Sequence, residues 1–133
     1  MFERVYSDTP RILAIQDVHL RASPEVSAPL VEFYQEVVGL RPVDPPPGQD
    51  VLGFRGVEAA GPRLIVVLAA DAPPPPVQRA VLVQVGSLAA CTEACRDRRL
   101  AYEIAQGWSF YDRRLFVEDP AGHRVEMTAS HVF

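Results

Sequence analysis

Glu126 is the residue of this 133-residue chain whose position points most directly to chemistry. The segment LFVEDPAGHRVEM, residues 115–127, predicts a strand, a tight turn at Asp-Pro-Ala-Gly and a second strand. Because side chains alternate along a strand, Glu126 should point away from the layer that Val125 and Met127 pack against. A carboxylate in that position needs a partner, a cavity or water.

Three polar side chains alternate near the N-terminus, where residues 12–22 predict a strand. Asp17, His19 and Arg21 fall on one face of that strand, and the residues between them are apolar. The polar face either lines a cavity or is simply solvated. In the first case these three are candidate ligand-binding residues.

The loop at residues 107–112 carries three aromatic side chains, more than a turn needs. Trp108 and Tyr111 could stack on a planar ligand or form an apolar lid over a cavity. Alternatively, they pack on the neighbouring sheet or on a second subunit.

Cys91 and Cys95 are the only cysteines and are spaced one turn apart in a predicted helix. Two cysteines on consecutive turns of a regular helix are poorly placed for a disulfide. They could form a thiol pair for redox or metal chemistry, but the pattern favours two buried, small, apolar side chains.

The composition excludes several classes of protein. The net charge is −4 and the arginines are scattered, which argues against a nucleic-acid partner. No apolar run approaches the roughly 20 residues that a membrane span requires. The first eleven residues mix charges with a proline, unlike a signal peptide. We therefore expect a cytoplasmic protein with no membrane partner.

Proline-rich segments indicate how the chain is organised. The run APPPP at residues 72–76 predicts an extended spacer, and the prolines at 45–47 predict a surface loop. We accordingly divide the chain into an N-terminal extension at 1–11, a first module at 12–71, a linker at 72–77 and a second module at 78–133.

Both modules have the predicted order β-α-β-β-β. In the first, a helix begins after Ser23 and ends at Gly39, and strands are expected at 12–22, 40–43, 51–57 and 63–69. In the second, a helix begins after Ser87, and strands are expected at 79–85, 100–105, 113–118 and 123–128. The second helix has no terminal glycine, so Arg98 or Arg99 would adopt a left-handed conformation at a cost of about 1 kcal/mol.

Three segments together resemble the vicinal oxygen chelate superfamily, which contains glyoxalase I, bleomycin-resistance proteins and extradiol dioxygenases. They are Val-His-Leu-Arg at 18–21, Phe-Tyr-Gln-Glu-Val-Val-Gly-Leu at 33–40, and Asp-Pro-Ala-Gly-His-Arg-Val-Glu at 119–126. The resemblance covers residues 12–128. It implies paired βαβββ modules around an open cavity, but it is poorly specific for activity.

In metal-dependent members, four inward positions hold a divalent ion, one on the first and one on the last strand of each module. Carried over to this chain, the last position is Glu126, and the first is either Asp17 or His19. The last strand of the first module, 64–68, has no ligand, and the first strand of the second module offers only Ala80 or Leu82. The metal site, His19 with Glu126, is therefore incomplete, because catalytic sites usually have three protein ligands.

Two more histidines bear on that site. His123 would need a bulge to reach Glu126, and His131 would need to fold back, so both are more simply explained as solvent-exposed. Without a metal, Glu126 would form an ion pair with Arg21 or Arg55.

The predicted fold is α+β, with paired βαβββ modules forming an open, eight-stranded, barrel-like sheet and two helices outside. The leading hypothesis is a glyoxalase/bleomycin-resistance-like protein that binds a small molecule, with no cofactor, in a polar cavity lined by Asp17, His19, Arg21, Arg55, Trp108, Tyr111 and Glu126. Exposed strand edges favour a homodimer.

Two alternatives remain open at this point. One is a metal-dependent lyase, isomerase or dioxygenase, in which His19 (or Asp17) and Glu126 bind Zn, Ni, Mn or Fe. Glu126 or His19 would then also be the catalytic base. The other is a non-catalytic, partner-binding subunit whose cavity is filled by side chains. Three or more polar groups around an open void would favour ligand chemistry over this last hypothesis.

Overall fold

The computed structural model describes residues 9–73, 80–107 and 113–129. Along the chain the elements are β1 (Arg11–Ile12), β2 (Val18–Ala22), the 3₁₀ turn η1 (Pro24–Val26), the helix α2 (Ser27–Glu32), the π-helical turn η2 (Phe33–Val38), β3 (Arg41–Val43), β4 (Val51–Arg55), β5 (Arg63–Leu68), β6 (Ala80–Val85), the helix α3 (Leu88–Asp97), β7 (Tyr102–Gln106), β8 (Arg113–Glu118) and β9 (Arg124–Ala129).

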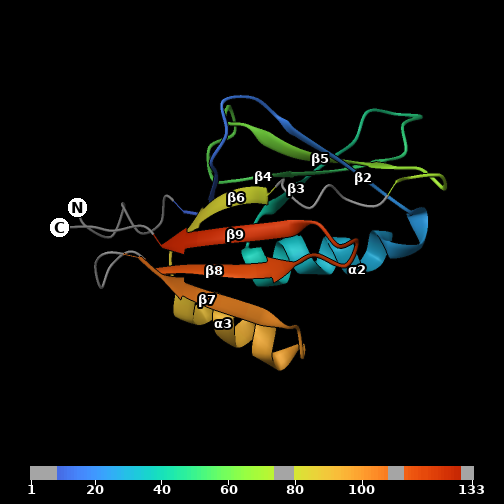
Figure 1. The fold of residues 1–133 in the computed structure, drawn as a ribbon. Helices are drawn as coiled ribbons and strands as arrows, with labels where there is room; N and C mark the ends of the chain where they lie inside the picture. The colour runs from blue at the N-terminus through green and yellow to red at the C-terminus, as the bar shows by residue number, and fades with distance from the viewer. Residues whose placement is uncertain (1–8, 74–79, 108–112, 130–133) are drawn as a thin grey trace.

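These strands form two mixed sheets (Figure 1). The first has the order β1-β6-β9-β8-β7 and the second the order β2-β5-β4-β3. In each module the first and last strands are parallel neighbours, β2 with β5 and β6 with β9, and the other pairs are antiparallel. The α+β fold with open sheets and two outer helices, expected from the sequence, is therefore confirmed.

The helix of the first module begins and ends where the sequence predicts. The Ser23 hydroxyl accepts a hydrogen bond from the Glu25 N–H, and Pro24 occupies the first turn. Gly39 ends the helix with a φ of 91°, in the left-handed region. The last turn widens into a π-helix, in which the Tyr34 carbonyl accepts hydrogen bonds from the N–H groups of both Gly39 and Leu40.

The helix of the second module confirms the predicted strain at its end. The Ser87 hydroxyl accepts a hydrogen bond from the Ala90 N–H at the start of α3. After its last turn Arg99 has a φ of 56°, in the left-handed region where glycine is usual. Cys91 and Cys95 are free and buried, which agrees with their interpretation as small apolar side chains. Burial raises the pKa of the Cys91 thiol to about 11.

The core lies between the helices and the sheet faces that they cover. Figure 1 shows α2 and α3 on the same side of the first sheet. Alternate residues of β5, β6, β8 and β9 face this layer, and those least accessible to solvent include Leu64, Val66, Val81, Val83, Leu115, Val125 and Met127. The other faces of the sheets are left to carry polar side chains.

One predicted strand is wrong. Residues 12–22 do not form a continuous strand, because β1 pairs with β6 in the first sheet and β2 pairs with β5 in the second. Residues 13–17 cross from one sheet to the other, so the described residues contain nine strands instead of eight. No described helix has the length and apolar character needed to cross a membrane.

Candidate ligand site between β2 and β6

The pairing of the strands shows which residues occupy the four inward positions, which the sequence left open. β2 sets His19 opposite Ile65 of β5, and β6 sets Leu82 opposite Glu126 of β9. Ile65 and Glu126 each stand two residues after the arginine that begins their strand, so His19 is the counterpart of Leu82. Asp17 precedes β2 and falls outside this set.

Glu126 lies on the face of its strand that the sequence predicts, since Val125 and Met127 on either side are buried. Its carboxylate accepts a hydrogen bond from the Arg114 guanidinium at 2.7 Å. The predicted ion pair of Glu126 with Arg21 or Arg55 is therefore wrong. The nearer cation is Arg114 on β8, in the same hairpin. Phe116 of β8 pairs with Glu126, and Arg114 lies two residues before Phe116.

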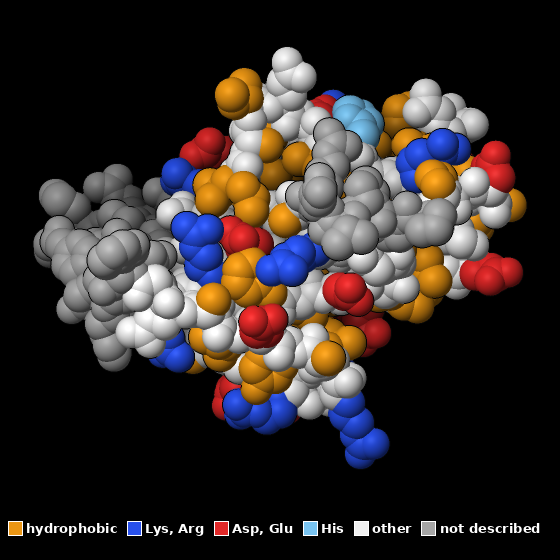
Figure 2. All heavy atoms as spheres, in the orientation of Figure 1, with side chains coloured by type: hydrophobic (Ala, Val, Ile, Leu, Met, Phe, Trp, Pro, Cys, Tyr) orange, Lys and Arg blue, Asp and Glu red, His pale blue; other side chains and the backbone are white. Residues whose placement is uncertain are grey.

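Figure 2 shows the side of β8 and β9 that faces away from the helices, where hydrophobic side chains are interleaved with charged ones of both signs. The Arg124 guanidinium lies over the Phe116 ring, 4.3 Å from its centre. Glu126 is thus part of a surface of paired charges, and its side chain is only 18% exposed.

Asp17 is held by one neighbour. Its carboxylate accepts two hydrogen bonds from the Arg63 guanidinium, at 2.8 and 3.2 Å, and a third from the Arg63 backbone N–H at 2.8 Å. These hydrogen bonds lower the pKa of Asp17, the side-chain contact contributing most. Asp17 therefore acts as an anionic group that links the start of β2 to the start of β5.

A hollow of about 650 Å³ lies between β2 and β6. One side is formed by β2 and the residues that lead into it, which bring Asp17, His19 and Arg21 to the hollow. The other side includes Ala80, Val81 and Leu82 of β6, and the remaining lining residues are Leu13, Ala14, Gln16, Val18, Leu20, Pro73 and His123. Its volume is in the range of small-molecule sites, and its walls are largely apolar with a few polar groups.

The hollow contains only some of the predicted site residues. Glu126 and Arg55 are not among its lining residues. The Arg55 guanidinium instead donates a hydrogen bond to the Gly56 carbonyl at 3.1 Å. Arg21 approaches Asp71 at 3.8 Å on the surface. Trp108, Tyr111 and His131 lie outside the described residues.

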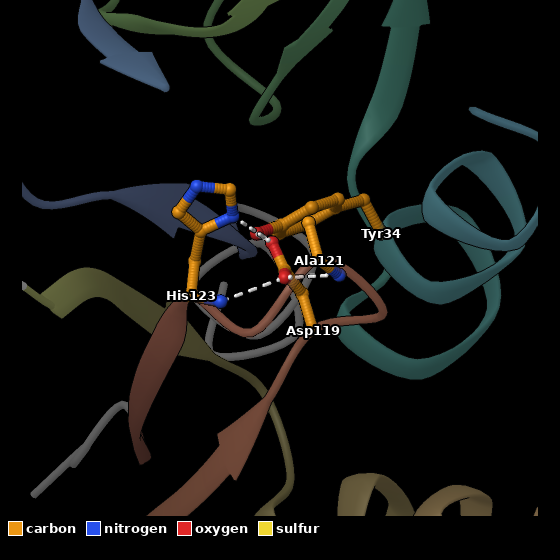
Figure 3. A network of polar contacts seen from close by, with 4 residues as sticks. All are labelled: Tyr34, Asp119, Ala121 and His123. Atoms are coloured by element: carbon orange, nitrogen blue, oxygen red, sulfur yellow. Dashed lines mark hydrogen bonds and ion pairs between the residues drawn. The ribbon is translucent and has the colours of Figure 1, made fainter. Parts of the chain in front are cut away.

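Asp119, which the sequence indicates only as a turn residue, is the centre of a buried polar network (Figure 3). One carboxylate oxygen accepts hydrogen bonds from the backbone N–H groups of Ala121 and His123, both at 2.9 Å. The other accepts the Tyr34 hydroxyl proton at 2.6 Å and lies 2.9 Å from Nδ1 of His123. Burial raises the pKa of Tyr34 well above its usual value, and the Asp119 charge adds to this.

The prediction for His123 is also wrong. The sequence indicates a solvent-exposed histidine, but His123 is only 5% exposed. Its side chain turns back onto Asp119, because Gly122, with a φ of 92°, closes the turn between β8 and β9. His123 therefore lines the hollow and is not a solvent-exposed surface residue.

The donor set does not fit a complete metal site. Catalytic sites use about three protein ligands, whereas of the four inward positions only His19 and Glu126 can coordinate an ion. Glu126 is already paired with Arg114. Nowhere in the described parts of the chain do three His, Cys, Asp or Glu side chains gather into a group that could hold a metal ion.

Three residues that shape this region were not assigned a role from the sequence: Tyr34, Arg114 and Asp119. The hairpin register could have indicated Arg114, because the turn at 119–122 fixes which residues of β8 lie beside Glu126. The contact of Tyr34 with Asp119 joins residues 85 positions apart, and no local pattern predicts it.

Comparison with solved structures reveals many proteins with this fold, and the three described below have low sequence identity to this chain. A protein from Bacillus anthracis assigned to the glyoxalase family has a TM-score of 0.71 at 15% identity, covering 90% of this chain and 97% of that one. TnmS3, an antibiotic-binding protein from Streptomyces sp. CB03234, has a TM-score of 0.65 at 19% identity, with coverages of 90% and 98%. Lactoylglutathione lyase from Agrobacterium tumefaciens has a TM-score of 0.59 at 21% identity, with coverages of 89% and 94%.

No protein-family model matches the sequence, and no curated protein matches it. The likeness to known proteins is therefore one of structure, and it agrees with the resemblance seen in the sequence. The chain has the fold of these glyoxalase and bleomycin-resistance proteins.

Proposed function

We propose that this protein binds a small molecule in the hollow between β2 and β6, and that it does so without a complete metal site. The observation that carries the proposal is the set of polar side chains around this open space. Asp17, His19, Arg21 and His123 line a hollow of about 650 Å³ that is otherwise largely apolar. Such a combination suits a ligand with an apolar body and a few polar groups.

Three features support this proposal over a filled, partner-binding subunit. The space between β2 and β6 is open, it carries more than three polar side chains, and Leu82 on its wall is 39% exposed. A filled interior would have covered Leu82 and paired its polar groups with one another. The fold is also that of TnmS3, which is an antibiotic-binding protein.

The metal-dependent enzyme remains the second candidate, because His19 and Glu126 occupy two of the four inward positions and lactoylglutathione lyase shares the fold. In this chain His19 would supply an imidazole ligand and Glu126 a carboxylate, and the ion would act as a Lewis acid. This candidate is disfavoured for two reasons. Arg114 competes with an ion for Glu126, and the other two inward positions are Ile65 and Leu82, which cannot coordinate a metal.

The homodimer stays a prediction. Ile15, which follows β1, and Ile104 on β7 are exposed hydrophobic side chains outside the hollow, and a second copy of the chain would cover such residues. Light scattering coupled to size-exclusion chromatography measures the mass directly. We expect twice the chain mass of 14.7 kDa.

The binding proposal is tested by chemical-shift mapping of ¹⁵N-labelled protein with polar aromatic fragments in the presence of EDTA. We expect shifts concentrated on the amides of β2 and β6. Leu82→Trp, which places an indole ring in the hollow where it obstructs a ligand, should abolish them. Ile104→Trp is the matched control, since Ile104 is similarly exposed, at 42%, but is not among the residues that line the hollow. Shifts that persist in Leu82→Trp would contradict the proposed location.

A further inference from the structure

His123 presents one ring nitrogen that its own network does not use. The ring is held through Nδ1, which lies 2.9 Å from an Asp119 oxygen. That carboxylate also accepts the Tyr34 hydroxyl proton and two backbone N–H groups, so each of its oxygens has two polar neighbours. An oxygen that accepts in this way requires a donor from the ring, and Nδ1 therefore carries a proton.

The tautomer follows from this contact. In a neutral imidazole one nitrogen donates and the other accepts, so a proton on Nδ1 leaves a lone pair on Nε2. A carboxylate behind the ring fixes both its orientation and its tautomer. In its neutral form, His123 is thus held by Asp119 as an oriented hydrogen-bond acceptor.

Nε2 faces the hollow. Figure 3 shows the second ring nitrogen of His123 pointing away from Asp119 and Tyr34. Among the described residues it has no hydrogen-bond partner, although the whole residue is only 5% exposed. No described side-chain nitrogen or oxygen is both fully enclosed and without a partner, so Nε2 reaches open space. That space is the hollow, because His123 is one of its lining residues.

We infer that His123 is the anchoring residue of the proposed ligand site, and that its Nε2 accepts a hydrogen bond from a hydroxyl or N–H group of the ligand. The inference rests on the proposed function, and it names the chemistry of the ligand. The anchor lines the same space as the apolar side chains of Leu13, Val81 and Leu82. The ligand class is therefore a largely apolar molecule, such as an aromatic ring, that carries a protic donor.

Discrimination between ligands follows from the direction of this hydrogen bond. A site that presents a buried acceptor rejects an analogue that lacks the donor, because the acceptor would lose its access to water and gain no partner. A phenol should therefore bind more tightly than its methyl ether, although the two have nearly the same shape.

The test uses phenol and anisole as probes on full-length protein in EDTA. Long-range ¹H–¹⁵N spectra of the imidazole rings report each nitrogen separately, and His123→Asn identifies the His123 signals by their loss. We expect phenol to move the Nε2 resonance of His123 toward the N–H range and to leave Nδ1 almost unchanged. Anisole should move neither nitrogen.

His123→Asn is also the matched binding variant, because its amide can still donate to Asp119 but offers no group in the position of Nε2. We expect phenol to bind it about tenfold more weakly, the effect of one lost hydrogen bond, while anisole binding is unchanged. The wild-type imidazole spectra test the inference even if this variant fails to fold.

Two adverse outcomes are distinguishable. If phenol shifts the amides of β2 and β6 but leaves Nε2 unmoved, or binds wild type and His123→Asn equally, the anchor is wrong and the proposed site survives. If neither probe shifts those amides, the proposed binding site is itself contradicted, together with the anchor.

Discussion

The hydroxyl of Tyr34 donates a hydrogen bond of 2.6 Å to Asp119, and this contact joins the helix of the first module to the β8–β9 turn of the second. Both side chains are inaccessible to solvent. Tyr34 also packs edge-on against Phe33 and lies beside Phe54, so its ring is fixed from the side of the first module. The modules are thereby connected beside His123, which contacts Asp119 and lines the hollow.

Tyr34→Phe should destabilise the protein while leaving the aromatic packing in place. Only the hydroxyl is removed, and hydrogen bonds to charged groups contribute about 1.5–3 kcal/mol. We expect the free energy of unfolding, measured by urea denaturation, to fall by about that amount. A change within 0.5 kcal/mol, the usual range for surface substitutions, would show that the contact does not hold the modules together.

Tyr34 also predicts how stability depends on alkaline pH. Its pKa is raised in the folded state, so above the unfolded value of about 10 the unfolded chain releases a proton that the folded chain keeps. The contribution of Tyr34 is complete below pH 10 and is lost progressively as the pH rises beyond it. Urea denaturation between pH 8 and 11 should give a steeper loss for wild type than for Tyr34→Phe. Parallel curves would contradict the assignment.

Arg99→Gly should stabilise the protein. Arg99 has a φ of 56°, and glycine adopts that conformation without the steric cost of about 1 kcal/mol that a side chain incurs. We expect the free energy of unfolding to rise by about 0.5–1 kcal/mol. Arg98→Gly is the control, because Arg98 has a φ of −97° and gains nothing from glycine. Equal effects of the two substitutions would mean that the strain at Arg99 is not what limits stability.

The two thiols should be inert in the folded protein. The pKa of Cys91 is raised to about 11, chiefly by burial, and that of Cys95 is raised for the same reason. At pH 8 we expect almost no reaction with a chromogenic disulfide reagent until urea unfolds the chain, after which both cysteines should react. Rapid reaction of either thiol in native conditions would contradict the packing of α3 against the sheet.

The sequence predicted most of the fold because each element carries its own signal. Ser23 and Gly39 mark the ends of the first helix, and the strand at 113–118 is observed with the predicted bounds. The strained end of the second helix could be recognised because a glycine is missing there. What failed was the strand at 12–22, since a change of sheet leaves no pattern in an alternating segment.

The site was less predictable than the fold. Strand alternation placed Glu126, His19 and Arg21 on the faces that the structure shows, because parity depends only on local geometry, whereas Asp17 precedes β2 and is not part of that alternation. It could not identify their partners. The partners are residues of other strands or of the other module: Arg114, Arg63 and Asp119. Their contacts depend on strand register and on packing, which the pattern of a single strand does not encode.

The content of bound metal tests the central claim most directly: Glu126 is paired with Arg114 and does not serve as a metal ligand. The protein is purified without chelator or affinity metal, its metals are quantified, and Glu126→Ala is treated in the same way. We expect far less than one zinc, nickel, manganese or iron ion per chain in wild type, and the same metal content in Glu126→Ala. Near-stoichiometric metal that disappears in Glu126→Ala would contradict it and favour a metal-dependent enzyme.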